Sequence, residues 1–220
     1  MSVGRVGKTT NSPDDVVGSA LAAERKAMWG EIPGEIVSFD PSNQTGTIKP
    51  LYRPTFNGEP IDMPNLLEVP VRFARAGGGG VTFPVKAGDK VTLRPQMRST
   101  ENYLDDGDGQ ASDDRSFNIS DMEAHLDGGE SLQDPIQGFD ADNVHMRFDT
   151  AGNYGLKGSE TGKVALHGAE GNIYLLLARA VEIIAEHETK VTAGSSVGNY
   201  SHTLAGEAAE IAAKLRAMAL

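Results

Sequence analysis

The chain has 220 residues, which fits one or two domains and is long enough to bury a core. It contains no cysteine, so disulfides, thiolate nucleophiles and cysteine-based zinc sites are excluded. Its formal net charge of −11 argues against a nucleic-acid-binding surface, because such surfaces are normally basic.

The first thirty residues predict an arm followed by a helix. Residues 1–11 are small, polar and basic, and we expect them to be mobile or bound to a partner. Ser12 is a favourable N-cap, the next residue is proline, and a helix is predicted from there to about Trp29, ended by Gly30. The N-terminus has no apolar signal region and no apolar run approaches about 18 residues, so we expect folding in the cytoplasm.

Residues 31–100 alternate between apolar and polar side chains and predict an OB-type β-barrel. Glycine is frequent, at 26 residues, which favours many turns between short strands. Pro70 suggests an edge strand or a bulge, and Ala76–Gly80 is predicted to be a flexible loop. The five predicted strands are residues 34–39, 45–51, 66–73, 81–84 and 91–94.

Residues 101–142 are strongly acidic, with 13 Asp and Glu and a single basic residue, Arg115. This segment alone therefore accounts for the net charge of the chain. It is predicted to be a solvated loop region that completes the barrel and links it to the second half of the chain, with a short strand at residues 116–119.

Residues 143–168 predict a second β region of three strands of about five residues each. Val144, Met146 and Phe148 alternate with polar residues, and glycine-rich turns separate the strands. Strands this short do not make a stable sheet in one chain. The prediction is therefore an intertwined trimeric β-prism or β-helix, in which three subunits share one core.

Residues 169–220 predict a helical hairpin. Gly168–Gly171 is expected to break the strands, Asn172 to cap the first helix, and residues 192–201 to form a polar loop. The second helix carries apolar residues at steps of four and three, which is the spacing of an oligomeric seam. The predicted fold class is thus mainly β with helical ends.

The predicted trimer core is drawn from the prism and the hairpin. Its candidates are Val144, Met146, Phe148, Leu156, Val164, Leu166, Ile173, Leu176, Leu177, Leu204, Ile211, Leu215 and Met218.

Three motifs resemble ligand-binding sites, but each lacks residues or a structural context that such a site needs. Gly7-Lys8-Thr9 lacks the earlier glycine and the strand of a phosphate-binding loop. Gly77–Gly80 precedes a predicted strand, whereas phosphate binding needs a helix N-terminus. Asp105–Gly109 does not keep the EF-hand frame and is interpreted as a solvated acidic loop with adventitious cation binding as an alternative.

The histidines and carboxylates do not predict a catalytic centre. No pair of the five histidines has metal-binding spacing; His145 and His167 are predicted to be solvated on the outward face, with a three-fold metal site as the alternative. The acidic residues lie in a loop region with few aromatics, so an apolar pocket around a glycosidase carboxyl is not expected. The sequence therefore predicts no catalytic residue, metal or cofactor, and no enzyme.

Four stretches of the barrel region resemble one protein family. They are residues 33–52, residues 67–83 with "VPV" and a glycine-rich loop, residues 86–93 with "GDKV", and residues 115–121, "RSFNISD". Together they resemble the N-terminal OB-fold domain of the central-spike, or baseplate assembly, proteins of contractile-tailed phages, over residues 31–125.

The resemblance implies a homotrimeric virion component in the tail baseplate. Such a spike closes the end of the tail tube beneath the hub protein and leads penetration of the host envelope, which it contacts transiently. Because this chain ends in helices and lacks the His-x-His metal apex of some such spikes, either a separate spike-tip protein or a helical tip is expected to form the point. A tape-measure protein is a further expected partner.

Two other functions remain as alternatives. An OB-fold module that binds nucleic acid or protein needs aromatic residues on the barrel face, for which Phe39, Tyr52, Phe56 and Phe73 are available, but the acidic charge opposes nucleic-acid binding. A cell-wall hydrolase is the less favoured alternative.

Overall fold

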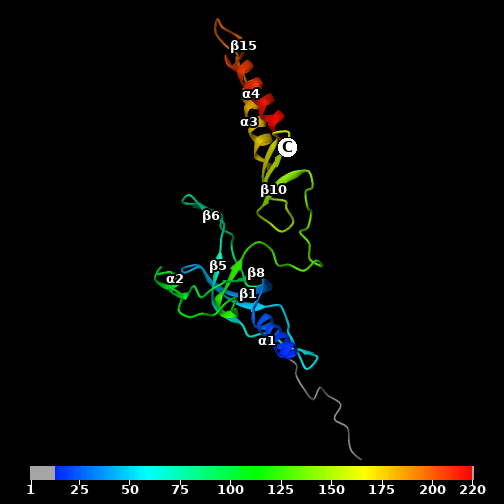
Figure 1. Cartoon of the computed structure of the whole chain (residues 1–220). Helices are drawn as coiled ribbons and strands as arrows, with labels where there is room; N and C mark the ends of the chain where they lie inside the picture. Colours follow the sequence, from blue (N-terminus) through cyan, green and yellow to red (C-terminus); the bar gives the residue numbers. More distant parts are fainter. Residues whose placement is uncertain (1–12, 220) are drawn as a thin grey trace, which may run out of the picture. The chain divides into compact units, whose positions relative to one another are not determined.

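The computed structural model describes residues 13–219, which divide into two compact units (Figure 1). We call residues 13–134 the barrel unit and residues 135–219 the C-terminal unit. The predicted N-cap Ser12 and the Gly7-Lys8-Thr9 motif lie outside the described residues. The prediction of a mainly β chain with an N-terminal helix, a closed five-stranded barrel and a C-terminal helix is confirmed.

Helix α1 (Pro13–Ala27) forms where it was predicted and buries none of its residues. Its acidic first turn and basic last turn complement the helix dipole. After the helix, the backbone N–H of Trp29 donates to the carbonyl of Phe117 at 2.9 Å, and its ring meets Tyr52 edge-on at 6.3 Å. Trp29 thus anchors the end of α1 to the barrel.

The barrel closes in the strand order β1-β2-β5-β9-β8. Every neighbouring pair is antiparallel except β5 and β9, which pair in parallel through Val71 and Arg72 only. This five-stranded closed arrangement agrees with the predicted OB-type barrel. The strands are β1 (Ile32–Asp40), β2 (Thr45–Pro50), β5 (Leu66–Arg72), β8 (Lys90–Pro95) and β9 (Met122–His125).

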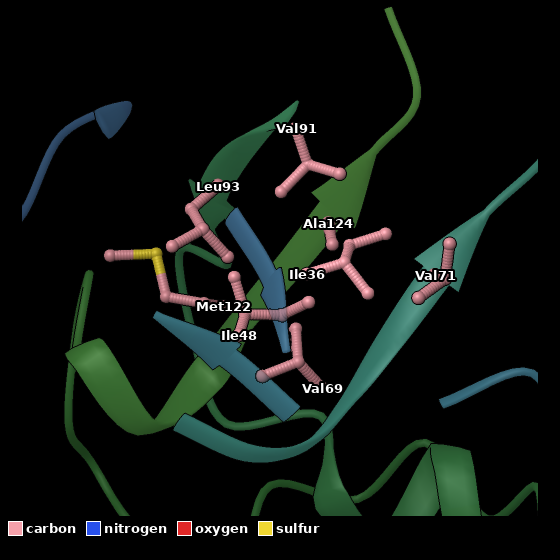
Figure 2. Packing of buried hydrophobic residues seen from close by; sticks show 8 residues of the cluster. All are labelled: Ile36, Ile48, Val69, Val71, Val91, Leu93, Met122 and Ala124. Atoms are coloured by element: carbon pink, nitrogen blue, oxygen red, sulfur yellow. The ribbon is translucent and has the colours of Figure 1, made fainter. Parts of the chain in front are cut away.

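The barrel interior is a small but complete apolar core (Figure 2). Alternate residues of each strand point inward, so the period-two pattern of the sequence becomes one continuous cluster. The strands approach closely at Gly34, where a Cβ atom would lie 2.8 Å from the side chain of Ile48. The core residues are Ile36, Ile48, Val69, Val71, Val91, Leu93, Met122 and Ala124.

Two of the predicted strands were wrong. Residues 81–84 do not form a strand, and Val81 and Phe83 are exposed. The strands in this region are instead β6 (Arg75–Ala76) and β7 (Gly79–Gly80), which form a short hairpin around the predicted loop. Residues 116–119 are not a strand either, because Asn118 caps a 3-10 turn at Ile119–Asp121. The fifth barrel strand is β9, which follows this turn directly.

Pro70 sits beside a bulge rather than on an outer edge. Three steps from Leu66 to Val69 on β5 oppose two steps from Ile48 to Gly46 on β2, so the register shifts by one residue. Pro70 pairs with Thr45 and precedes the β5–β9 ladder, where its missing N–H would matter. Of the two alternatives predicted for Pro70, an edge strand or a bulge, the bulge is confirmed.

Short elements decorate the barrel. A second two-residue hairpin consists of β3 (Thr55–Phe56) and β4 (Glu59–Pro60). The acidic segment opens with a short helix, α2 (Glu101–Asp105), which the sequence did not predict.

The single basic residue of the acidic segment holds it onto the barrel. Arg115 binds both carboxylate oxygens of Asp121, at 2.6 and 2.8 Å, and also contacts Asp113 and Glu101. The side chain of Asp121 is only 2% exposed, and these bonds, chiefly the one to Asp121, raise the pKa of Arg115. The "RSFNISD" stretch therefore carries both partners of an ion pair that positions β9.

The C-terminal unit begins with an antiparallel sheet in the order β10-β11-β12-β13. Gly168–Gly171 does not break the strands as predicted but turns β12 into the short strand β13. The sheet strands are β10 (Asn143–Arg147), β11 (Gly155–Ser159), β12 (Val164–Gly168) and β13 (Gly171–Asn172).

A helical hairpin follows the sheet, as predicted. Its helices are α3 (Ile173–Glu186) and α4 (Ala205–Met218), and the Asn172 side chain caps α3 by accepting from the N–H of Tyr174 at 3.0 Å. Part of the predicted polar loop is instead a hairpin of β14 (Glu188–Val191) and β15 (Gly198–Ser201). Within residues 13–219, no helix is long and apolar enough to cross a membrane.

Replacing Arg115 tests the role of its ion pair. We expect Arg115→Met to destabilise the barrel unit by about 3 kcal/mol, because Asp121 is left buried without its charged partner. Urea unfolding followed by the fluorescence of Trp29, the one tryptophan of the chain, measures this. The control is Arg53→Met, which removes an exposed pair with Asp62 and should cost under about 1 kcal/mol. Equal effects of the two substitutions would contradict the assignment.

Candidate assembly surface

The C-terminal unit buries only small apolar side chains. Removing one methyl-sized group from water stabilises a protein by only about 0.8 kcal/mol, whereas a leucine or isoleucine gives about 1.5–3 kcal/mol. The barrel unit buries the larger kind, but the C-terminal unit does not. Its buried hydrophobic residues are Ala165, Ala178, Ala208, Ala212 and Ala219.

One face of the β10-β11-β12 sheet is apolar and uncovered. Met146, Leu156 and Leu166 are successive cross-strand neighbours in the register, so their side chains form a row across the three strands. Met146 is 51% exposed and Leu156 42%, and Leu166 is half-buried. We call this the apolar sheet face; its other members are Val144, Phe148 and Val164.

The opposite face of the same sheet is polar and covered. Arg147 donates to the backbone carbonyls of Gln137 and Gly138, and the carboxylate of Asp149 accepts from the N–H of Tyr154 at 2.8 Å. The loop before β10 and the turn after it are thereby drawn over the polar residues. Each single chain therefore covers the polar face and leaves the apolar one open.

His145 lies on that covered face, so the prediction that it is solvated was wrong. Both ring nitrogens are buried and lack a hydrogen-bond partner among the described residues. Desolvation lowers the pKa of His145, with smaller contributions from Lys157 and Arg147. The prediction failed because alternation separates two faces but does not say which one the chain itself covers. His167, in β12, is half-buried.

The two helices of the hairpin pack through alanines. Ala178 of α3 and Ala208 and Ala212 of α4 are buried, and the close approach of the helices is bridged at one point by an ion pair. There the guanidinium of Arg216 donates to both carboxylate oxygens of Glu182, at 2.5 and 2.9 Å. The bond to Arg216 is the largest cause that lowers the pKa of Glu182 to about 2.

The outer sides of both helices are apolar stripes. On α3, residues 173, 176, 177, 183 and 184 share one side at helical spacing and are each 45–55% exposed. On α4, Leu204, Ile211 and Met218 are seven residues apart and are each 45–52% exposed. Only these three residues of the predicted seam of α4 are exposed. The other two differ, because Ala208 is buried and Leu215 is half-buried. We call these stripes the outer helix stripes.

The structure leaves the thirteen predicted trimer-core residues at the surface of one chain. Ten are more than 40% exposed, and the other three, Val164, Leu166 and Leu215, are half-buried. Sequence reasoning missed Ile183, which is 55% exposed and follows Leu176 by seven residues. That spacing was the available signal. Whether these residues meet in a trimer stays a prediction.

Two of the aromatic residues considered for nucleic-acid stacking pack against the barrel core and are partly buried. The rings of Phe39 and Phe73 meet edge-on at 6.2 Å and pack against the core. Tyr52 is engaged by Trp29, and Phe56 remains 66% exposed on its hairpin. The four rings do not form a continuous stacking platform.

The barrel region matches one protein-family model. Residues 32–126 match the family model described as "Phage protein Gp138 N-terminal domain", a range that runs from the start of β1 to just past β9. The match supports a phage protein family and agrees with the resemblance over residues 31–125, although it covers less than half of the chain. The search of curated proteins found no match.

The Glu182–Arg216 pair predicts a pH dependence of the helical hairpin. A carboxylate whose pKa is lowered by folding adds stability above its ordinary pKa of about 4.5, and that stability is lost as the pH falls toward about 2. We therefore expect the helicity of the C-terminal unit, measured by circular dichroism, to fall over this range.

Two substitutions isolate the contribution of Glu182 from that of other carboxylates. Glu182→Gln should flatten the pH profile, whereas Glu210→Gln, on the exposed side of α4, should keep the wild-type profile. Identical profiles for wild type and Glu182→Gln would show that the pair does not stabilise the hairpin.

Proposed function

We propose that this chain, a phage protein by the match of its barrel unit, is the structural central spike of a contractile tail baseplate. Three copies close the end of the tail tube and lead penetration of the host envelope when the sheath contracts. The role is mechanical and needs no catalytic residue or cofactor. The barrel unit contacts the baseplate hub protein, and a separate tip protein and the tape-measure protein are further partners.

The observation that carries this proposal is that the C-terminal unit exposes its large apolar side chains and buries only small ones. Its interior holds alanines, while the apolar sheet face and the outer helix stripes are exposed. A surface of this kind is unstable in water unless another surface covers it. A copy of the same chain offers a matching apolar surface, and a symmetric closed oligomer covers every copy equally.

Mutual coverage explains how such a unit becomes a stiff rod. Each five-residue strand is too short for a stable sheet alone, but three sheets that share one apolar core gain the burial that each lacks. Subunits joined in this way do not separate without exposing that core. The number three comes from the family resemblance, and the exposed residues support an oligomer of this type.

The alternative functions find less support in the structure. Phe39 and Phe73 are packed in the barrel, and the chain is acidic, which disfavours a single-strand binding groove. We therefore favour a structural role over nucleic-acid binding and over cell-wall hydrolysis.

Charged substitutions in the outer helix stripes test the assembly. We expect Leu177→Glu with Ile184→Glu to convert trimers to monomers at micromolar concentration, because each trimer would have to bury six added carboxylates. Sedimentation velocity measures the change. Leu132→Glu is the matched control, since Leu132 is 97% exposed in the barrel unit and the trimer should persist. A double variant that sediments like the wild type would contradict the proposal.

Electron microscopy tests the proposed location. Gold-labelled antibodies to this chain should bind at the end of the tail tube in particles whose baseplate has been opened. Label on the capsid, the sheath or the tail fibres would refute a central spike while leaving the oligomer intact.

A further inference from the structure

Two segments of the C-terminal unit meet over the polar face of its sheet. One is the loop that leads into β10, residues 135–142, and the other is the turn after β10, residues 149–154. They approach closely, because a Cβ atom at Gly138 would lie 3.2 Å from the carbonyl oxygen of Ala151. Arg147 of β10 holds the loop through the carbonyls of Gln137 and Gly138. We call these two segments the sheet cover.

The side chain of His145 lies beneath the sheet cover. A Cβ atom at Gly152, whose φ is +75°, would lie 3.1 Å from Cε1 of the imidazole, so the backbone of the turn packs against the ring. Both ring nitrogens are buried, and neither has a hydrogen-bond partner among the described residues. A second proton on this ring would therefore bury a positive charge that has no hydrogen-bond acceptor.

Basic side chains share the polar face with His145. Lys157 of β11 is its direct cross-strand partner, and Arg147 lies two residues further along β10. His167 of β12 belongs to the neighbouring row of the same face. Lys157 is itself paired with Asp140, at 3.3 Å. A proton added to His145 would therefore meet like charge from its own strand and from the next one.

The two carboxylates near His145 are already engaged. Asp140, in the loop, accepts from the side-chain amide of Asn143 at 3.0 Å, and Asp149, in the turn, accepts from the N–H of Tyr154 at 2.8 Å. These two bonds are the largest causes that lower the pKa of Asp140 and of Asp149. Both carboxylates therefore stay ionised in mildly acidic solution, where an imidazole gains its charge.

The pH range of the effect follows from the direction of the shift. Burial of the imidazole lowers the pKa of His145, and Lys157 and Arg147 add to this. A base whose pKa falls on folding stabilises the closed arrangement fully above its ordinary pKa of about 6.5, and this stability is lost as the pH falls below that value. Protonation of Glu182 acts only below about pH 4.5, so the two effects occupy different ranges.

We infer that His145 is an acid-sensitive switch for the sheet cover: the neutral imidazole lets the loop and the turn close over the polar face, and the protonated one opens them. The loop is the segment by which the chain enters the C-terminal unit at residue 135, so its release lengthens the free connection between the two units. The apolar sheet face lies on the other side of the strands. The inference rests on the geometry of one chain and not on the proposed spike or trimer.

Hydrogen–deuterium exchange of the full chain tests the switch. After correction for the chemical exchange rate, peptides from residues 135–142 and 149–154 should exchange faster at about pH 5 than at about pH 7.5, by up to about tenfold for each pKa unit that separates the covered ring from the open one. Peptides from β1 and β2, which contain no histidine, should not change. Equal protection of the sheet cover at both pH values overturns the inference.

Two substitutions on the same sheet face assign the response to one residue. His145→Gln removes the titration, and the sheet cover should then be equally protected at both pH values. His167→Gln is the matched control in the neighbouring row and should keep the wild-type response. A response that survives in His145→Gln, or that disappears in His167→Gln, overturns the assignment. Sedimentation of the same variants reports the oligomer separately, so a failure here is distinguishable from a failure of the proposed spike.

Histidine NMR of the wild-type chain gives a measurement that does not depend on how a variant folds. The chain has five histidines, and the ring signal of His145 is identified by its contact with Gly152. Its titration midpoint should lie below that of the exposed His187. A His145 signal that titrates together with that of His187 would overturn the switch.

Discussion

The main physical constraint on this protein is that the C-terminal unit buries few large apolar side chains within a single chain. Folding costs conformational entropy for every ordered residue, and alanine contacts offset little of it. The large side chains that would offset it, such as Met146, Leu177 and Ile211, face outward. In the proposed trimer, this apolar surface, which the polar loop over His145 leaves open, is covered by the other copies and supplies the missing burial.

The barrel unit, in contrast, buries its large apolar side chains within the single chain. Eight inward-facing residues form its core, and Arg115 holds the acidic segment in place so that β9 closes the barrel. In the proposed spike, the barrel unit, which is complete by itself, is the fixed platform, and the C-terminal unit, completed by its copies, is the rod. This division gives a physical reason for both units to occur in one chain.

The sequence predicted those features that depend on local pattern. Period-two alternation located four barrel strands, and the cap at Asn172 located α3. The errors came from long-range choices. Residues 81–84 alternate as a strand should, but closure by parallel pairing selected β9 instead. His145 was placed in solvent because alternation alone does not reveal which face a loop will cover. The apolar candidates were found, but their outward placement requires the three-dimensional packing of α3 on α4.

Thermal unfolding of the full chain at several concentrations tests most directly whether the C-terminal unit is completed by its copies. If its folding is coupled to association, its midpoint, followed by circular dichroism of the helices, rises with protein concentration by mass action. The midpoint of the barrel, followed by Trp29 fluorescence, should stay constant. A helical midpoint that does not change over a hundred-fold range of concentration would contradict this account.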